Sequence, residues 1–305
     1  MKRLSLLTLT LLCCVGVAAE DYVLVWSEEF DYVGEPDPTK WTYEQGFVRN
    51  REWQWYQPQN AFVRDGVLTI TAREEHFPNP TFNPQSKYWG QQRDSVHCTS
   101  ACVITNGRQS FLYGRIEVRA RIPATPGTWP AIWMLGAQRN LPAAERKPWP
   151  YCGEVDIMEY YPVNGKPHIH ANACWGGNNG NSVWDSQAIP VVEGQEARPD
   201  TPPPPMGTPP SLGGELRGES LWTSEFHVWR MDWDEDWIRI YIDDELLNEI
   251  DLSQTVNGRY GEDNPFHKPM YLLLNLAMGS TGGQVDMQTM PARYEIDYVR
   301  YYRKD

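Results

Sequence analysis

The chain of 305 residues carries a formal net charge of −13 at pH 7, and 12% of its residues are aromatic. A chain this acidic, without a basic run, is a poor partner for nucleic acid or for an anionic membrane, so we expect neither. The length suits one large β domain as well as two smaller ones.

The first residues have the pattern of a secretory signal peptide. A basic start at residues 1–3 is followed by an apolar run over residues 4–17 and by small residues up to Ala19. The run is shorter than the about 20 apolar residues that span a bilayer. We therefore expect cleavage after Ala19, export to the periplasm or out of the cell, and a mature chain of residues 20–305.

Apolar and polar residues alternate repeatedly along the mature chain, whereas helical periodicity is almost absent. The clearest segments predict strands over residues 67–73, 113–122, 237–243, 270–277 and 294–302. Many such strands, separated by Gly, Pro and Asn turns, predict an all-β fold, a β-sandwich or jelly roll.

Residues 196–217 interrupt this pattern with a proline-rich stretch. Proline lacks the backbone donor that a sheet interior needs, so this stretch predicts irregular backbone. Because strand-like sequence lies on both sides, we expect a long loop within one domain. It is either a tolerated surface insertion or a loop at the rim of a binding site.

Three carboxylates, Glu154, Asp156 and Glu159, lie within an otherwise apolar segment that reads as a strand. Burying them is costly without a function. Glu154 and Asp156 share one face, while Glu159 would point to the other unless a β-bulge near residues 157–158 turns it back. The two glutamates could then approach to about 5–5.5 Å, the spacing of a retaining glycosidase. The alternatives are a solvated charged face or a cation site.

Four cysteines remain in the mature chain, and four cysteines allow three connectivities. Cys152 and Cys174 bracket the carboxylate strand and the start of the next one, so we prefer this pair as a disulfide. Free buried thiols are the alternative.

The box Glu154-x-Asp156-x-x-Glu159 resembles the catalytic signature of glycoside hydrolase family 16 in its bulged form. Four other segments resemble that family in the same order: residues 50–56, 127–135, 226–229 and 274–277. The resemblance covers essentially the whole mature chain. It implies a jelly-roll sandwich with a concave cleft, and a polysaccharide or glycan substrate. We expect a monomer.

The resemblance also implies roles for individual residues. Glu154 would be the nucleophile, Asp156 its assisting acid and Glu159 the general acid/base. Seven side chains are expected to bind the sugar: Trp129, Trp133, Asn50, Glu52, Gln54, His170 and Trp175. His170 could donate a hydrogen bond to a sugar hydroxyl or to Glu159.

Catalysis in this family needs no cofactor, but many members hold a structural calcium away from the cleft. Asp297, on the last strand, and the backbone of Gly66 match two of its ligands. Carboxylate and carbonyl oxygens are suitable donors for this hard cation.

The substrate is expected to be a β-1,3(4)-glucan, cut internally as by a laminarinase. Residues 168–178 depart from the His-Gly-Pro-Gly-Tyr stretch common in laminarinases. An endo-β-1,4-galactosidase acting on poly-N-acetyllactosamine chains of mucin O-glycans or keratan is therefore the alternative. The alternative from another class of protein is a non-catalytic, carbohydrate-binding lectin. A lectin would not need the three carboxylates, so their presence favours an enzyme.

Overall fold

The computed structural model describes residues 22–192, 216–217, 222–259 and 263–305. The predicted signal peptide and residues 196–215 of the predicted proline-rich loop lie outside these ranges. The last two residues of that loop form a strand instead, β13 (Leu216–Arg217), which pairs in parallel with the end of β12 (Ser182–Val192). Within the described ranges, no helix is long and apolar enough to cross a membrane.

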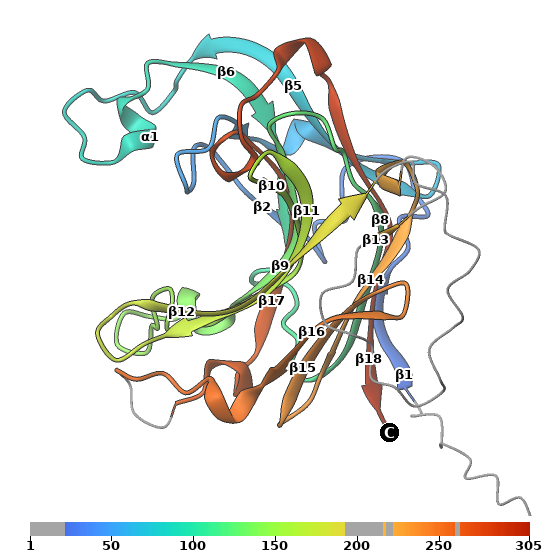
Figure 1. Ribbon diagram of the computed structural model, residues 1–305. Coiled ribbons are helices and arrows are strands. Elements are labelled where there is room, and N and C mark those ends of the chain that lie inside the picture. Colours follow the sequence, from blue (N-terminus) through green and yellow to red (C-terminus); the bar gives the residue numbers. More distant parts are fainter. Residues whose placement is uncertain (1–21, 193–215, 218–221, 260–262) are drawn as a thin grey trace, which may run out of the picture.

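Two large β-sheets make up the fold (Figure 1), and this confirms the predicted all-β sandwich. The larger sheet has ten strands, with β1 paired to β18 and β4 paired to β5 beside the main path. Along that path the order is β16 (Glu245–Asp251), β15 (Trp237–Ile242), β14 (His227–Trp233), β8 (Gly114–Arg121), β18 (Ala292–Lys304), β5 (Val67–Pro78), β6 (Ser95–Ser100) and β3 (Trp55–Tyr56). The two added strands are β1 (Tyr22–Glu28) and β4 (Ala61–Arg64).

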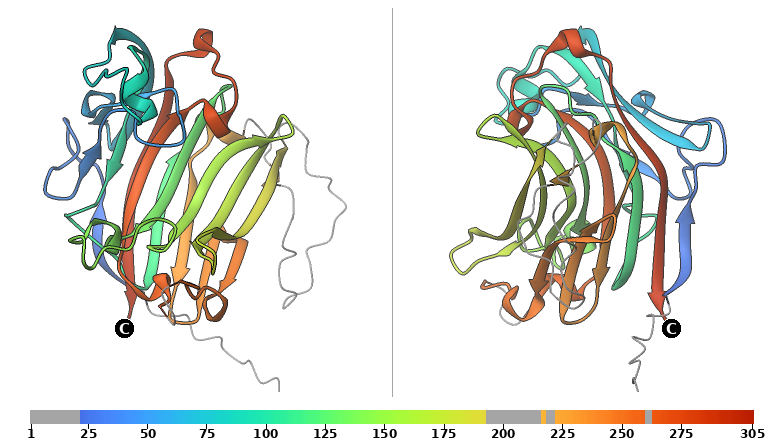
Figure 2. Two further views of the ribbon diagram at one scale, coloured as in Figure 1. Left: turned by 90° about the vertical axis from the view of Figure 1, so that its left-hand side faces the viewer. Right: turned by 45° about the vertical axis from the view of Figure 1, so that its right-hand side comes forward.

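The smaller sheet has eight strands and forms the concave side of the molecule (Figure 2). Its order is β13, β12, β11 (Lys166–Gly176), β10 (Glu154–Val163), β9 (Thr128–Gly136), β17 (Met270–Met278), β7 (Cys102–Ile104) and β2 (Thr42–Glu44).

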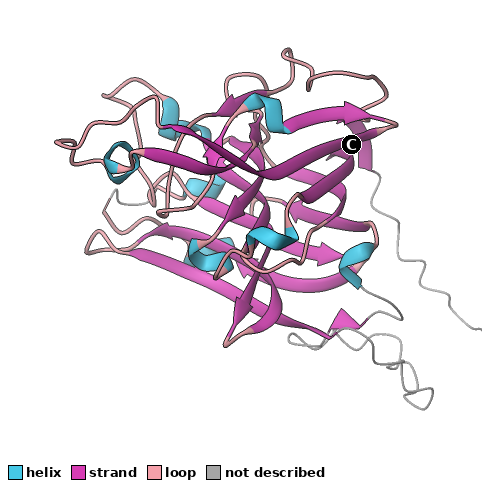
Figure 3. Ribbon diagram, turned by 90° about the horizontal axis from the view of Figure 1, so that it is seen from above, coloured by secondary structure: helices cyan, strands magenta, loops and turns pink. Residues whose placement is uncertain are grey.

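Helices are short and lie between the strands (Figure 3). They are α1 (Trp89–Gln92) and the 3-10 turns η1 (Pro58–Asn60), η2 (Ala137–Asn140), η3 (Trp222–Ser224), η4 (Leu252–Gln254), η5 (Pro265–His267), η6 (Ser280–Gly282) and η7 (Met287–Thr289).

One apolar core fills the space between the two sheets, because alternate side chains of each strand point inward. In β8, Ile116 and Val118 point into this core, while Arg115, just before Ile116, pairs with Asp232 on the outer face. Strand β17 is buried along its whole length, as its apolar run predicts, because it lies between β9 and β7 in the middle of the smaller sheet.

Four cysteines of the described residues are buried free thiols: Cys98, Cys102, Cys152 and Cys174. The preferred disulfide between Cys152 and Cys174 is therefore wrong, and the alternative of buried thiols holds. Burial raises the pKa of Cys152 to about 11, so this thiol stays protonated and unreactive near neutral pH.

Candidate active site

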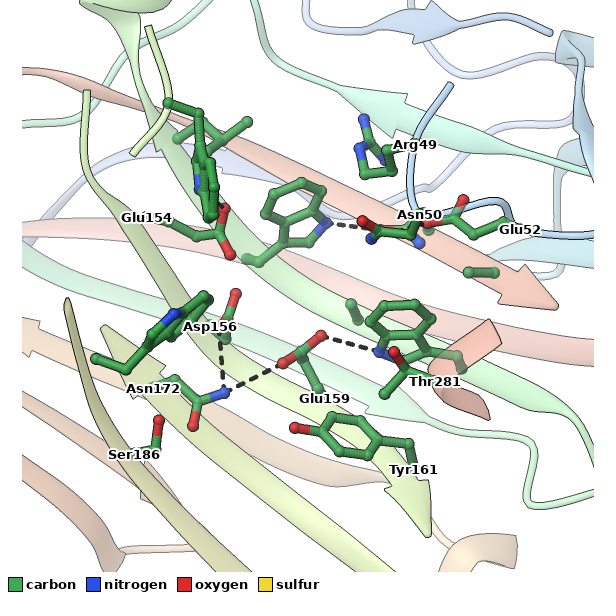
Figure 4. Close-up of a pocket in the computed structure, with 18 of the residues that line it drawn as sticks. Arg49, Asn50, Glu52, Glu154, Asp156, Glu159, Tyr161, Asn172, Ser186 and Thr281 are labelled. Atoms are coloured by element: carbon green, nitrogen blue, oxygen red, sulfur yellow. Dashed lines mark hydrogen bonds between the residues drawn. The ribbon is translucent and has the colours of Figure 1, made fainter. Parts of the chain in front are cut away.

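A β-bulge in β10 brings the three carboxylates to one face of the smaller sheet. Asp156 and Glu159 are three residues apart, but their partners in β11, Asn172 and His170, are only two apart. Two successive side chains between the carboxylates, residues 157–158, both point into the core and absorb the extra residue. The predicted bulge is confirmed, and the carboxylates face the same cleft (Figure 4).

Glu159 is held from both neighbouring strands. The indole nitrogen Nε1 of Trp129, on β9, donates a hydrogen bond of 2.9 Å to Oε1 of Glu159. The amide Nδ2 of Asn172, on β11, donates one of 3.1 Å to the other oxygen, Oε2. The same amide also donates 3.1 Å to Oδ2 of Asp156 (Figure 4). One side chain thus links two of the three carboxyl groups and fixes their relative position.

Glu154, at the start of β10, receives its hydrogen bond from a loop rather than from a strand. Nε1 of Trp149, in the segment between η2 and β10, lies 2.9 Å from Oε2 of Glu154. The indole N–H stabilises the ionised form of this carboxyl group.

Burial is the main cause that raises the pKa of all three carboxyl groups. It raises the pKa of Glu154 to about 7, against the opposing hydrogen bond from Trp149. The pKa of Glu159 reaches about 8, because the charge of Glu154 adds to burial. Asp156 is only 2% exposed, and burial followed by the charges of both glutamates raises its pKa well above the usual value. The charge of Glu154 thus favours the protonated form of Glu159.

The carboxylates line a cleft of about 530 Å³ on the concave face. Its walls come from β9 to β12, from β17 and from the loop that carries residues 49–52. Aromatic rings and amide or carboxyl groups occur together in this lining. Sugar binding requires this combination, because rings stack on the sugar while polar groups bind its hydroxyls.

Asn50 and Glu52 line the cleft as expected, but Gln54 does not. Gln54 is buried behind Glu52 and donates a hydrogen bond of 2.6 Å to its carboxylate. The side-chain oxygen Oε1 of Gln54 accepts a hydrogen bond of 2.7 Å from the backbone N–H of Met278. The expected sugar contact of Gln54 is therefore corrected: this side chain orients Glu52, since its polar groups are used within the protein.

Trp129 and Trp133 both line the cleft, as the sequence predicts. Nε1 of Trp133 donates a hydrogen bond of 2.6 Å to Asn275 on the adjacent strand β17. The guanidinium of Arg49 lies over the ring of Trp133, 5.0 Å from its centroid. Arg49 also forms an ion pair with Glu44, so the charge beside the ring is compensated.

The expected substrate contacts of His170 and Trp175 are corrected. His170 lies under Tyr161, a cleft residue, with ring centroids 3.5 Å apart, and its Nε2 lies 3.2 Å from the backbone oxygen of Tyr161. It reaches neither the cleft nor Glu159. Trp175 points to the opposite face of β11, is 9% exposed and packs in the core against Phe266. The strand continues regularly through this point, so parity keeps Trp175 inward.

The structural calcium expected at Asp297 and Gly66 stays a prediction. Asp297 is ion-paired with Arg119, whose guanidinium already compensates its charge. In the described ranges, no three His, Cys, Asp or Glu side chains gather in a group that could hold a metal.

Sequence reasoning missed several residues of the cleft, among them Asn172, Trp149 and Trp184. Asn172 has the parity of His170 in a predicted strand beside the carboxylates, so its direction toward them could have been found. Trp149 and Trp184 carry no comparable signal, because loop conformation and strand order bring them to the cleft.

A concave β-sheet that presents three closely spaced carboxylates in an aromatic cleft is suited to glycoside hydrolysis. The family model of glycosyl hydrolases family 16 matches residues 47–197 and 211–300. The chain belongs to this family and is an endo-acting glycoside hydrolase of jelly-roll fold. Hydrolases of the family act without a catalytic cofactor.

Known relatives resemble the chain over nearly its whole length. A β-glucanase of Rhodothermus marinus is 34% identical, and the match covers 99% of this chain and 95% of the relative. The solved laminarinase structure from Rhodothermus marinus has 32% identity and a TM-score of 0.68, covering 93% of this chain and 98% of that one. Another solved structure comes from work on endo-acting O-glycanases of human gut bacteria that initiate mucin breakdown. It has 30% identity and a TM-score of 0.74, and the match covers 93% of this chain and 91% of that one.

Proposed function

We propose that the enzyme cleaves internal β-glycosidic bonds with retention of configuration. Glu154, in its ionised form, attacks the anomeric carbon, while Glu159, whose protonated form is favoured by the charge of Glu154, donates its proton to the leaving oxygen. In the second step Glu159 takes a proton from water, which then releases the sugar from Glu154. The β-bulge of β10 carries this proposal, because it sets both glutamates on the cleft face.

Asp156 and the residues that hold Glu159 assist these steps. Asp156 lies between the two glutamates and shares the amide of Asn172 with Glu159. Burial and the charges of both glutamates raise its pKa, which favours its protonated form and so limits the negative charge beside the nucleophile. Trp129 and Asn172 keep Glu159 in place over the scissile bond.

We infer that a β-1,3(4)-glucan is the first candidate substrate. The support is the β-glucanase of Rhodothermus marinus, which resembles the chain from end to end. A β-1,4-galactoside chain, as in mucin O-glycans or keratan, is the second candidate. It is favoured by the TM-score of 0.74 with the structure from the O-glycanase work and by the departure at residues 168–178.

Export and a monomeric state are part of the same proposal. The leader pattern ending at Ala19 supports export. N-terminal mass spectrometry of protein from the periplasm and the medium should find Glu20 as the first residue. A protein that retains its leader in the cytoplasm would contradict export. Light scattering should give the mass of one chain.

The substrate test is an assay of laminarin, lichenan, keratan and mucin O-glycans side by side, with Glu154→Ser as the inactive control. We expect short oligosaccharides from laminarin, with chain lengths that fall gradually as internal cuts accumulate. Release from keratan or mucin alone would select the second candidate. No release from any of the four polymers would overturn the proposal.

A further inference from the structure

Two exposed tryptophans stand in the half of the cleft that lies over β11 and β12. Trp149 is 42% exposed and Trp184, on β12, is 43% exposed. Their ring centroids are 6.5 Å apart and the ring planes are tilted by 52°, so neither ring covers the other. The residues at the other end of the cleft, Asn50 and Glu52, come from the loop beyond β17 and β9. Open indole faces on this side of the carboxylates can stack on a sugar ring.

Trp149 also contacts the carboxyl group that we propose as the nucleophile. Its Nε1 donates the hydrogen bond of 2.9 Å to Glu154, and no second side chain of the described ranges hydrogen-bonds this carboxylate. Glu159, in contrast, is held by two donors from buried strands. The position of Glu154 therefore depends on a side chain that itself lies exposed in the cleft.

We propose that Trp149 and Trp184 form a sugar-binding subsite, and that Trp149 acts as a positioning residue for Glu154. A neutral sugar ring stacked on the two indoles would fix Trp149, and its N–H would then hold Glu154 in the ionised, attacking orientation. The inference rests on the proposed role of Glu154 as the nucleophile. Binding of a sugar beyond the cleaved bond would thereby increase the rate of the chemical step as well as the affinity.

Substitution of Trp149 leaves the identity of the other charged and titratable groups that face Glu154 unchanged. They are Arg49, Arg139, Asp156, Glu159, Cys152 and Cys174. Because their charges do not change, a shift in the ionisation of Glu154 would report the loss of the indole donor.

The two functions of the pair can be separated by substitution. Trp149→Phe keeps an aromatic ring but removes the donor, whereas Trp184→Ala removes only a ring. Trp237→Phe, on β15 of the larger sheet, is the matched control. Each variant is assayed for kcat and KM over a range of pH, on oligosaccharides of increasing length, with its melting temperature measured alongside.

Trp149→Phe should lower kcat and move the acidic limb of the pH profile to higher pH, because the ionised form of Glu154 loses its hydrogen bond. Trp184→Ala should raise KM about tenfold on long oligosaccharides, as expected for a lost stacking contact, and leave the pH limb unchanged. Trp237→Phe should behave like the wild type. The melting temperatures of both cleft variants should stay near the wild-type value, since the rings are exposed.

A Trp149→Phe variant with wild-type kcat and pH profile would overturn the positioning role. Unchanged KM for Trp184→Ala at every oligosaccharide length would overturn the subsite. Failure of the proposed function has a different signature: full activity of Glu154→Ser would show that another group is the nucleophile, whatever the tryptophan variants do.

Discussion

The indole nitrogen of Trp129 lies 2.9 Å from Oε1 of Glu159 and donates a hydrogen bond to it. This donor favours the ionised carboxylate, so it partly opposes burial and the charge of Glu154, which raise the pKa of Glu159 to about 8. In Trp129→Phe the basic limb of the pH profile should therefore move to higher pH. The specificity constant kcat/KM should fall about tenfold, or about 1.4 kcal/mol.

The same variant separates a cleft role from a packing role. Trp129 is only partly buried, so Trp129→Phe should change the melting temperature little. A large loss of melting temperature with wild-type kinetics per folded molecule would show that the ring serves packing alone.

The two glutamates should respond differently to substitution. Glu154→Ser should abolish hydrolysis while leaving fold and substrate binding intact, since it removes the nucleophile. Glu159→Gln should stop turnover of polysaccharide but keep some activity on an aryl glycoside whose leaving group needs no protonation. Kinetics on both substrates and circular dichroism of each variant test this. Equal activity of either variant and the wild type on polysaccharide would refute the assignment.

Activity and stability should each depend on pH, but with different profiles. The kcat/KM profile should be bell-shaped, with limbs near the pKa values of about 7 for Glu154 and about 8 for Glu159. Between the ordinary carboxyl pKa of 4.5 and about 8, the folded state holds protons that the unfolded state has lost. The free energy of unfolding should therefore fall as the pH rises through this range.

Denaturant titrations of the wild type and Glu159→Gln at several pH values measure this contribution. The free energy of unfolding should fall less with rising pH in the variant, because the neutral amide has no proton to lose. Identical pH dependence of unfolding in the two proteins would mean that Glu159 titrates normally in the fold.

His170→Ala should affect stability rather than specificity. Burial lowers the pKa of His170 to about 4, so the ring is neutral at pH 7, and it supports Tyr161 from below. We expect a loss of about 1–3 kcal/mol in the free energy of unfolding. The ratio of activities on a β-glucan and a β-galactoside chain should stay unchanged. A tenfold change of that ratio would place His170 among the specificity residues after all.

The sequence predicted those strands well whose apolar and polar residues form a clear pattern within the segment itself. Period-two alternation located β5, β8, β15 and β18, and the continuous apolar run located β17. The bulge of β10 followed from parity, because Glu159 would otherwise be buried as an unpaired charge on the core face.

Contacts set by strand order or by loops could not be predicted from local pattern. Trp175 was expected in the cleft although its parity opposes that of His170, and the regular strand kept it in the core. Gln54 has the same chemistry as a sugar ligand, but its amide is used by Glu52 and Met278, which only the folded structure brings together. The Trp149–Glu154 hydrogen bond depends on a loop conformation with no sequence signal.

The central claim is that Glu154 and Glu159 act as nucleophile and acid/base in a double displacement. Proton NMR of the first sugar released from an oligosaccharide of defined linkage tests it most directly, when recorded before the product mutarotates. Two inversions at the anomeric carbon restore its configuration, so the account predicts the β-anomer as the initial product. An initial α-anomer would mean a single displacement by water, and it would contradict the assignment of Glu154 as the nucleophile.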